Sequence, residues 1–125
     1  MLTIDADGSR RIELEIDVAK DRKEKVVFWV RSQSFEDVIL VKQFIEKYNL
    51  IDMKDGMFEA ACYSMALRIT GWEGVAIKNG ENAPCTMEYK SAFFGLYPQS
   101  LGALLVSYGK VEEDESKNSQ TLQVG

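Results

Sequence analysis

Four apolar residues alternate with acidic residues near the start of the chain, and this alternation constrains the fold more than any other feature of the sequence. The apolar residues are Ile12, Leu14, Ile16 and Val18, and the acids between them are Glu13, Glu15 and Asp17. Because successive side chains of a strand point to opposite faces, the segment predicts a strand with one buried and one exposed face. The apolar face of so small a sheet must be covered by other elements.

A second strand is predicted at residues 26–30, where β-branched and aromatic residues are concentrated. The basic segment 20–25 lies between the two strands and predicts a solvated hairpin loop, so the strands should pair antiparallel. Residues 2–5 also alternate, which predicts a β-meander of two or three strands. We interpret residues 5–8 as a β-turn, because a calcium loop needs more oxygen ligands than this segment has.

A first helix is predicted over residues 35–48. Ser34 is a suitable N-cap for it, and Glu36 and Asp37 lie in its first turn, where the helix dipole favours acids. Its apolar residues are predicted to face inward and cover the sheet. They are Phe35, Val38, Ile39, Val41, Phe44, Ile45 and Tyr48.

A second helix is predicted after Asp52 or Asp55, either of which can cap it, and Gly71 is expected to end it in a left-handed conformation. The residues predicted to face inward are Phe58, Ala61, Cys62, Met65, Ala66 and Ile69. We interpret the methionines at positions 53, 57 and 65 as flexible core filler, with an adaptable binding surface as the alternative.

The rest of the chain predicts two more helices and a tail. Thr86 caps a third helix that ends near Pro98, and a fourth helix follows to about Lys110. Residues 111–125 are acidic and polar without an apolar period, which predicts a disordered tail after a single domain over residues 1–110. The sequence therefore predicts an α+β fold, with a small N-terminal antiparallel β-meander packed on a body of about four helices.

Composition excludes several functions. The chain has 125 residues, of which 46% are hydrophobic and 28% charged, as in ordinary globular proteins. A net charge of −5 argues against nucleic-acid binding, because phosphate recognition needs clustered Lys and Arg. No apolar run is long enough to span a bilayer, and residues 1–5 lack the pattern of a signal peptide, so we expect a cytosolic protein without a membrane partner. Cys62 and Cys85 are then expected to be reduced thiols.

The sequence offers little material for catalysis. It has no histidine, which excludes Ser-His-Asp and Cys-His arrangements, and two cysteines cannot build a closed zinc site. The spacing of Gly71, Gly74 and Gly80 fits neither a P-loop nor a dinucleotide-binding loop. Glu73 is the one acid beside an aromatic residue in a structured loop, and we interpret it as a backbone cap rather than a general base. We therefore expect no enzyme, no cofactor and no metal.

Residues 67–75 read Leu-Arg-Ile-Thr-Gly-Trp-Glu-Gly-Val, and an Asn-Gly turn, a Pro-Cys-Thr helix start and a short helix before Tyr97-Pro98 follow. This arrangement resembles the small tail assembly proteins of long-tailed phages and prophages, over residues 35–110 in pattern. Their helical body carries a Trp-x-Gly-Val signature, an Asn-Gly or Asp-Gly turn and a Pro-x-Thr/Ser helix start. The residues that form the loop motif here are Gly71, Trp72, Glu73, Gly74, Val75, Pro84 and Thr86. We expect Trp72 to lock the loop onto the helices rather than to contact a partner.

The resemblance implies a tail assembly chaperone in the cytoplasm of the bacterial host. Such a protein binds the tape measure protein, keeps it soluble and assists polymerisation of the tail tube protein; homo-oligomerisation is left open. One alternative is a structural tail or head-to-tail joining protein that stays in the virion. Another is a small-ligand-binding domain or weak enzyme that uses a crevice beside Trp72 and Glu73.

A chaperone of this kind needs exposed apolar surface for the apolar stripe of a client helix. The last two predicted helices carry more apolar residues than one face can hide, so we expect the client to bind there. The expected partner-binding residues are Phe93, Phe94, Tyr97, Leu101, Leu104, Leu105 and Tyr108.

Overall fold

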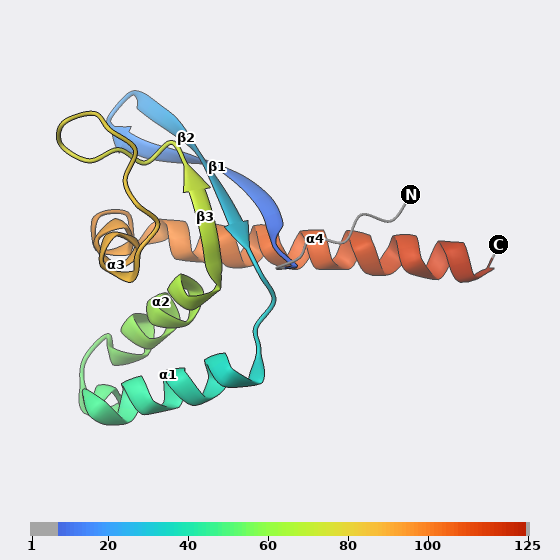
Figure 1. Ribbon diagram of the computed structural model, residues 1–125, viewed down its shortest axis with the longest axis horizontal. Coiled ribbons are helices and arrows are strands. Elements are labelled where there is room, and N and C mark those ends of the chain that lie inside the picture. The colour runs from blue at the N-terminus through green and yellow to red at the C-terminus, as the bar shows by residue number, and fades with distance from the viewer. Residues whose placement is uncertain (1–7, 125) are drawn as a thin grey trace.

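A computed structural model of the chain describes the backbone of residues 8–124 and the side chains of residues 8–114. Within those limits the fold is α+β, with one three-stranded antiparallel sheet and four α-helices, as predicted (Figure 1). The strands are β1 (Arg10–Ala19), β2 (Arg22–Val30) and β3 (Ile69–Glu73). The helices are α1 (Phe35–Lys47), α2 (Gly56–Arg68), α3 (Met87–Leu96) and α4 (Gln99–Val124), with a 3-10 turn, η1 (Leu50–Asp52), between α1 and α2.

The hairpin of β1 and β2 confirms both predicted strands and their antiparallel pairing. In its register Ile12 lies opposite Phe28, and Leu14 lies opposite Val26. The predicted loop at residues 20–25 is too long, because only residues 20 and 21 form the turn and residues 22–25 belong to β2. Charge pairing across the strands supports this extension, since Lys25 Nζ lies 3.2 Å from Glu13 Oε1.

The third strand was not predicted at its actual place. The sequence indicated a helix running to Gly71 and a loop after it, whereas α2 ends at Arg68 and the chain continues in an extended conformation as β3. The free edge of β2 offers backbone partners, and the β-branched and aromatic residues of this segment suit a strand. Gly71 lies opposite Trp29, where a Cβ atom would stand 3.7 Å from the indole ring. The other candidate third strand, residues 2–5, and most of the predicted turn at 5–8 lie outside the described residues.

One face of the sheet forms the core with α2, α3 and α4. Phe28 lies at its centre and is fully buried, and its ring meets Phe93 edge to face at a centroid distance of 5.5 Å. The Thr86 cap of α3 is confirmed, since its hydroxyl accepts a hydrogen bond from the Tyr89 backbone. The other buried core residues are Ile12, Leu14, Ile16, Val26, Val30, Met65, Ala66, Ile69, Phe93, Phe94, Leu101, Leu104 and Tyr108.

Helix α1 lies outside this core, with α2 between it and the sheet (Figure 1). Its predicted N-cap is confirmed, since Ser34 and Asp37 form a capping box. Its predicted inward face is wrong, because Phe35 is 80% exposed and Val38, Ile39 and Tyr48 are exposed as well. Phe44 and Ile45 are half-buried, and Phe44 stacks on Tyr63 of α2 at 4.1 Å. The sheet has one apolar face, and three other helices already cover it.

Two further predictions of buried side chains, one for Phe58 and one for the methionines, differ from the structure. Phe58, expected to face inward on α2, is exposed at the start of that helix. Among the methionines expected to fill the core, Met65 is buried, whereas Met53 and Met57 are exposed.

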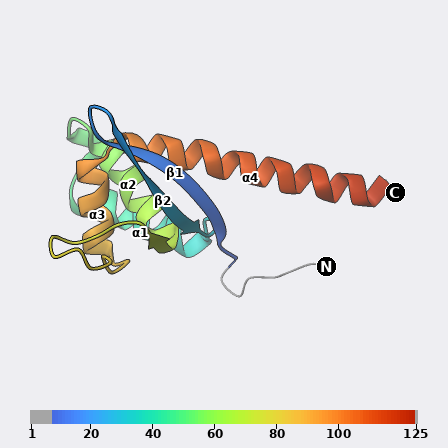
Figure 2. The ribbon, with the colours of Figure 1, turned by 90° about the horizontal axis from the view of Figure 1, so that it is seen from above.

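Helix α4 is longer than predicted. The sequence indicated helix to about Lys110 and a disordered tail at residues 111–125, whereas the backbone remains helical to Val124 and projects beyond the sheet (Figure 2). The first turns of α4 are held by the core, and adding residues to an existing helix costs little when the segment is rich in Glu, Lys and Gln. The predicted domain boundary at residue 110 therefore falls inside a helix.

Candidate functional site

Most of the residues expected to bind a partner are instead part of the core. Phe93, Phe94, Leu101, Leu104 and Tyr108 are all buried, and Leu104 is fully inaccessible. Tyr97 is half-buried and Leu105 is exposed. The apolar residues of α3 and α4 that looked surplus in sequence cover the sheet, since α4 crosses β1 and packs against its inner face. The expectation that these seven residues form one exposed surface is therefore wrong.

The loop motif has a structural role. Trp72 Nε1 donates a hydrogen bond of 2.8 Å to the carbonyl of Ala83, and its ring packs beside Phe28 and Phe93. This side chain thus joins β3 to the far end of the loop and packs on α3 through Phe93, whereas the expectation concerned only the helices. Gly74 has a positive φ of 92°, and a Cβ atom there would meet the Lys25 carbonyl at 2.5 Å, so only glycine fits. Glu73 and Pro84 are exposed.

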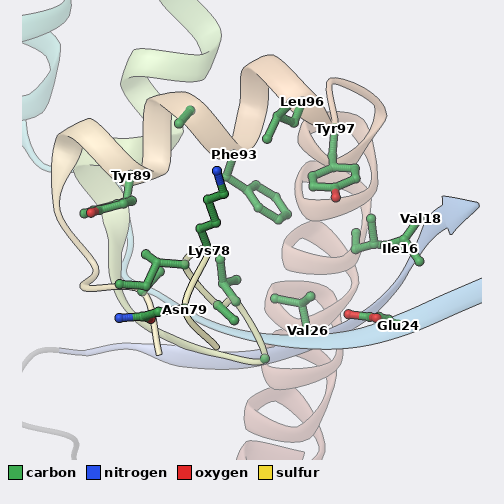
Figure 3. Close-up of a pocket in the computed structure, with 16 residues that line it drawn as sticks. Ile16, Val18, Glu24, Val26, Lys78, Asn79, Tyr89, Phe93, Leu96 and Tyr97 are labelled. Carbon is green, nitrogen blue, oxygen red and sulfur yellow. The ribbon is translucent and has the colours of Figure 1, made fainter. Parts of the chain in front are cut away.

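Two clefts lie on opposite sides of α3. The loop cleft, of about 720 Å³, opens between the β1–β2 hairpin, the loop after β3 and one side of α3. Figure 3 shows Lys78 reaching from that loop toward Phe93 on α3, with Glu24 at the strand side. The side chains of Trp72 and Glu73 do not line it. This cleft is therefore not the expected crevice beside Trp72 and Glu73. Its rim carries charges of both signs.

The helix cleft, of about 620 Å³, lies on the other side of α3 between α2, α3 and the end of α1. Phe94 of α3 lines it, so this residue contributes to a cleft although its own side chain is buried. The other residues that line it are Phe44, Asp55, Phe58, Glu59, Cys62, Tyr63, Leu67, Met87, Glu88, Ser91 and Gly95. The lining is apolar except for Ser91 and the three acids.

Most of the exposed large apolar side chains belong to the segment from α1 to the start of α2. Among residues 8–114, eight of the eleven exposed large hydrophobic residues lie in it. We call these residues the apolar hairpin surface: Phe35, Val38, Ile39, Tyr48, Ile51, Met53, Met57 and Phe58. Sequence reasoning missed this surface, although the four consecutive apolar residues 38–41 exceed what one buried stripe of a helix needs.

A buried ion pair fixes α1 to the rest of the molecule. Arg31 Nη1 and Nη2 contact the two carboxylate oxygens of Asp37 at 2.6 and 2.7 Å, and Nη2 also donates to the Leu67 carbonyl at 2.8 Å. The Asp37 side chain is 3% exposed. Hydrogen bonding to Arg31 holds the pKa of Asp37 well below its ordinary value. The pair therefore anchors the first turn of α1 beside the end of α2.

The titratable side chains inside the fold have structural roles. Lys90 Nζ donates to the carbonyls of Ala66 and Ile69 at 2.6 and 3.0 Å, which caps the end of α2, and burial lowers the pKa of Lys90. Cys62 and Cys85 are free, and burial raises the pKa of both thiols, which makes them weak nucleophiles. No group of acids and cysteines in the part of the chain that the structure describes is arranged to hold a metal ion.

Comparisons with protein-family models, curated proteins and solved structures found no match. None of the helices within residues 8–124 combines the length and the apolar character of a membrane span. The geometry offers exposed apolar side chains on α1 and the start of α2 and, beside them, an apolar cleft lined by three acids.

Proposed function

We propose that this protein is a tail assembly chaperone of a long-tailed phage or prophage. It acts in the cytoplasm of the bacterial host, where it binds the tape measure protein, keeps it soluble and assists assembly of the tail tube. The observation that supports this function best is the apolar hairpin surface, which lies outside the core. The resemblance of the Trp72–Gly74–Val75 motif to small tail assembly proteins supplies the identity of the client.

The apolar hairpin surface suits a helical client. Phe35, Val38 and Ile39 occupy the first two turns of α1, and Met57 and Phe58 occupy the first turn of α2. Buried apolar area contributes about 25 cal/mol per Å², so binding a client here recovers free energy that folding alone leaves unused. Methionine side chains at such a place adapt to clients of varied shape. The client-binding surface is thus proposed around α1 and α2 rather than on the face that α3 and α4 pack against the sheet.

The test is co-expression with the tape measure protein of the same phage genome. Wild-type protein should keep that client in the soluble fraction, and the Phe35→Ser/Ile39→Ser variant should lose most of this effect while its circular dichroism is unchanged. A matched control is Leu105→Ser/Val106→Ser, which changes two exposed apolar residues of α4. Wild-type protein without any effect on client solubility would remove the chaperone function. Loss of the effect only in the α4 variant would return the client to α4.

Mass spectrometry of purified virions separates this function from that of a structural tail or joining protein. A chaperone should be absent from the mature particle, whereas a joining protein is present in fixed proportion to the other tail proteins. Its presence at such a proportion would contradict the proposal even if the protein keeps the client soluble.

A further inference from the structure

The helix cleft lies beside the apolar hairpin surface and is lined mainly by two helices, α2 and α3. Phe58 and Cys62, one helical turn apart, line it from α2, and Ser91 and Gly95 do so from α3. Phe58 belongs to both the cleft and the hairpin surface. Gly95 leaves open space, because a Cβ atom built there would meet no heavy atom within 4 Å. Two helix faces thus form opposite sides of an apolar trough.

The charge of the rim is of one sign. Asp55, Glu59 and Glu88 line the cleft, and none of its lining residues is Lys or Arg. Among the ion pairs formed by residues 8–114, none involves these three acids. An apolar groove with unneutralised carboxylates along its rim complements a segment that carries positive charge beside an apolar stripe.

We propose that the helix cleft binds a cationic amphipathic helix, whose apolar stripe lies between α2 and α3 and whose flanking Lys or Arg residues face Asp55, Glu59 and Glu88. The proposal rests on the proposed function only for the identity of the client, the tape measure protein, and it predicts which of the client's helices is bound. A second copy of this chain is a poor occupant, because two acidic rims would face each other across a two-fold axis and the chain carries a net charge of −5.

The probes are two synthetic amphipathic peptides of about 18 residues, or five helical turns. Both have the same leucine stripe, with Lys on the polar face of one and Glu on that of the other. Fluorescence anisotropy should give at least about tenfold tighter binding of the Leu/Lys peptide. That binding should weaken as salt is raised, since exposed charge pairs are screened.

Gly95→Phe is the variant that fills the cleft. It should weaken binding of the Leu/Lys peptide by about tenfold or more, the loss typical of removing an interface anchor site. The matched control is Gly102→Phe, which places the same ring at an open helical glycine of α4 that lines no described cleft. Equal weakening by the two variants would overturn the proposal.

The rim is tested by neutralising two acids, Glu59→Gln/Glu88→Gln, against the matched pair Glu15→Gln/Asp17→Asn on β1. Only the first pair should weaken peptide binding and reduce its salt dependence. Equal effects of both pairs would mean that net charge alone attracts the peptide, which overturns the assignment of the rim. In a third readout, bound peptide should slow alkylation of Cys62, which lines the cleft, and leave Cys85 unchanged.

The peptide and tape measure experiments together separate the cleft proposal from the proposed function. If the wild-type protein and Gly95→Phe keep the tape measure protein equally soluble, the cleft is not the client site and the inference is wrong, while the chaperone function stands. If the Leu/Lys peptide binds the cleft but the tape measure protein is not kept soluble, the function fails and the chemistry of the cleft stands. A free protein that is a dimer in solution and that Gly95→Phe turns into a monomer would assign the cleft to a second copy and overturn the inference.

Discussion

Apolar side chains have different roles in two regions of the molecule. The first region is the sheet together with α3 and α4, and the second is the helical hairpin formed by α1 and the start of α2. In the first region Phe28, Phe94 and Leu104 are buried almost completely, whereas in the second Phe35 and Met57 are mostly exposed. Both regions look equally apolar in sequence. Hydrophobic residues at helical spacing therefore stabilise the fold in one place and remain available for binding in the other, and the difference is decided by which helices reach the single apolar face of the sheet.

The largest expected effect of mutation is at the centre of the core. Phe28→Ala should lower the free energy of unfolding by about 3 to 5 kcal/mol, because it removes a fully buried ring that contacts Trp72 and Phe93. Urea denaturation measures this change. A loss below about 1 kcal/mol would mean that the core is not organised around this ring, and the contrast with the hairpin would disappear.

The joint between the two regions should give an intermediate effect. Asp37→Asn removes the carboxylate that Arg31 binds through two contacts, and should cost about 2 to 3 kcal/mol, since charge-assisted bidentate pairs are among the stronger polar interactions. Amide hydrogen exchange should then rise in α1 more than in β2. Uniform acceleration across both would mean that the hairpin does not move separately from the core.

The same carboxylate makes stability depend on pH. The pKa of Asp37 is lowered in the folded protein from its ordinary 3.8, so the contribution of this group is fully present above that value and is lost as pH falls below it. Denaturation midpoints measured from pH 6 downward should therefore fall more steeply for wild-type protein than for Asp37→Asn. Parallel curves would place the acid sensitivity in other carboxylates.

The smallest expected effect is on the hairpin surface. Phe35→Ser should change the free energy of unfolding by less than about 0.5 kcal/mol, because the Phe35 side chain is 80% exposed. Thermal and urea denaturation should both be unchanged within error. A loss comparable to that of Phe28→Ala would show that α1 is docked in solution more closely than the structure indicates.

The parts of the fold that could be predicted depend on local signals. Alternation at Ile12–Leu14–Ile16 and the caps Ser34 and Thr86 are encoded within a few residues, and the structure confirms all of them. The strand β3 was missed because Gly71 follows apolar residues at helical spacing, and that pattern is also typical of a helix C-cap. The strand forms because the edge of β2 is free, which no local pattern reveals.

The candidate site could not be predicted for a related reason. Leu104 and Ile39 both lie at apolar positions of helices, yet the first is fully buried and the second is exposed. Which of them faces solvent depends on the order in which helices cover the sheet, and this order is set by long-range packing. Asp55 and Glu59 lie one turn apart at the start of α2, but Glu88 comes from α3, so the meeting of all three acids follows only from the tertiary structure.

The path of the chain around Arg31 has a consequence for how such a protein can change. Arg31 follows β2 and Arg68 precedes β3, and the two residues exchange hydrogen bonds: the Arg31 backbone N–H donates to the Arg68 carbonyl at 2.9 Å, and Arg68 Nε donates to the Arg31 carbonyl at 3.0 Å. Everything between them leaves and rejoins the sheet at one point, as an insertion in an ordinary antiparallel strand connection does. The exposed apolar side chains on this excursion, such as Phe35 and Met57, can thus change without disturbing the strand pairing beneath them, whereas Asp37 and Leu50 are buried in it.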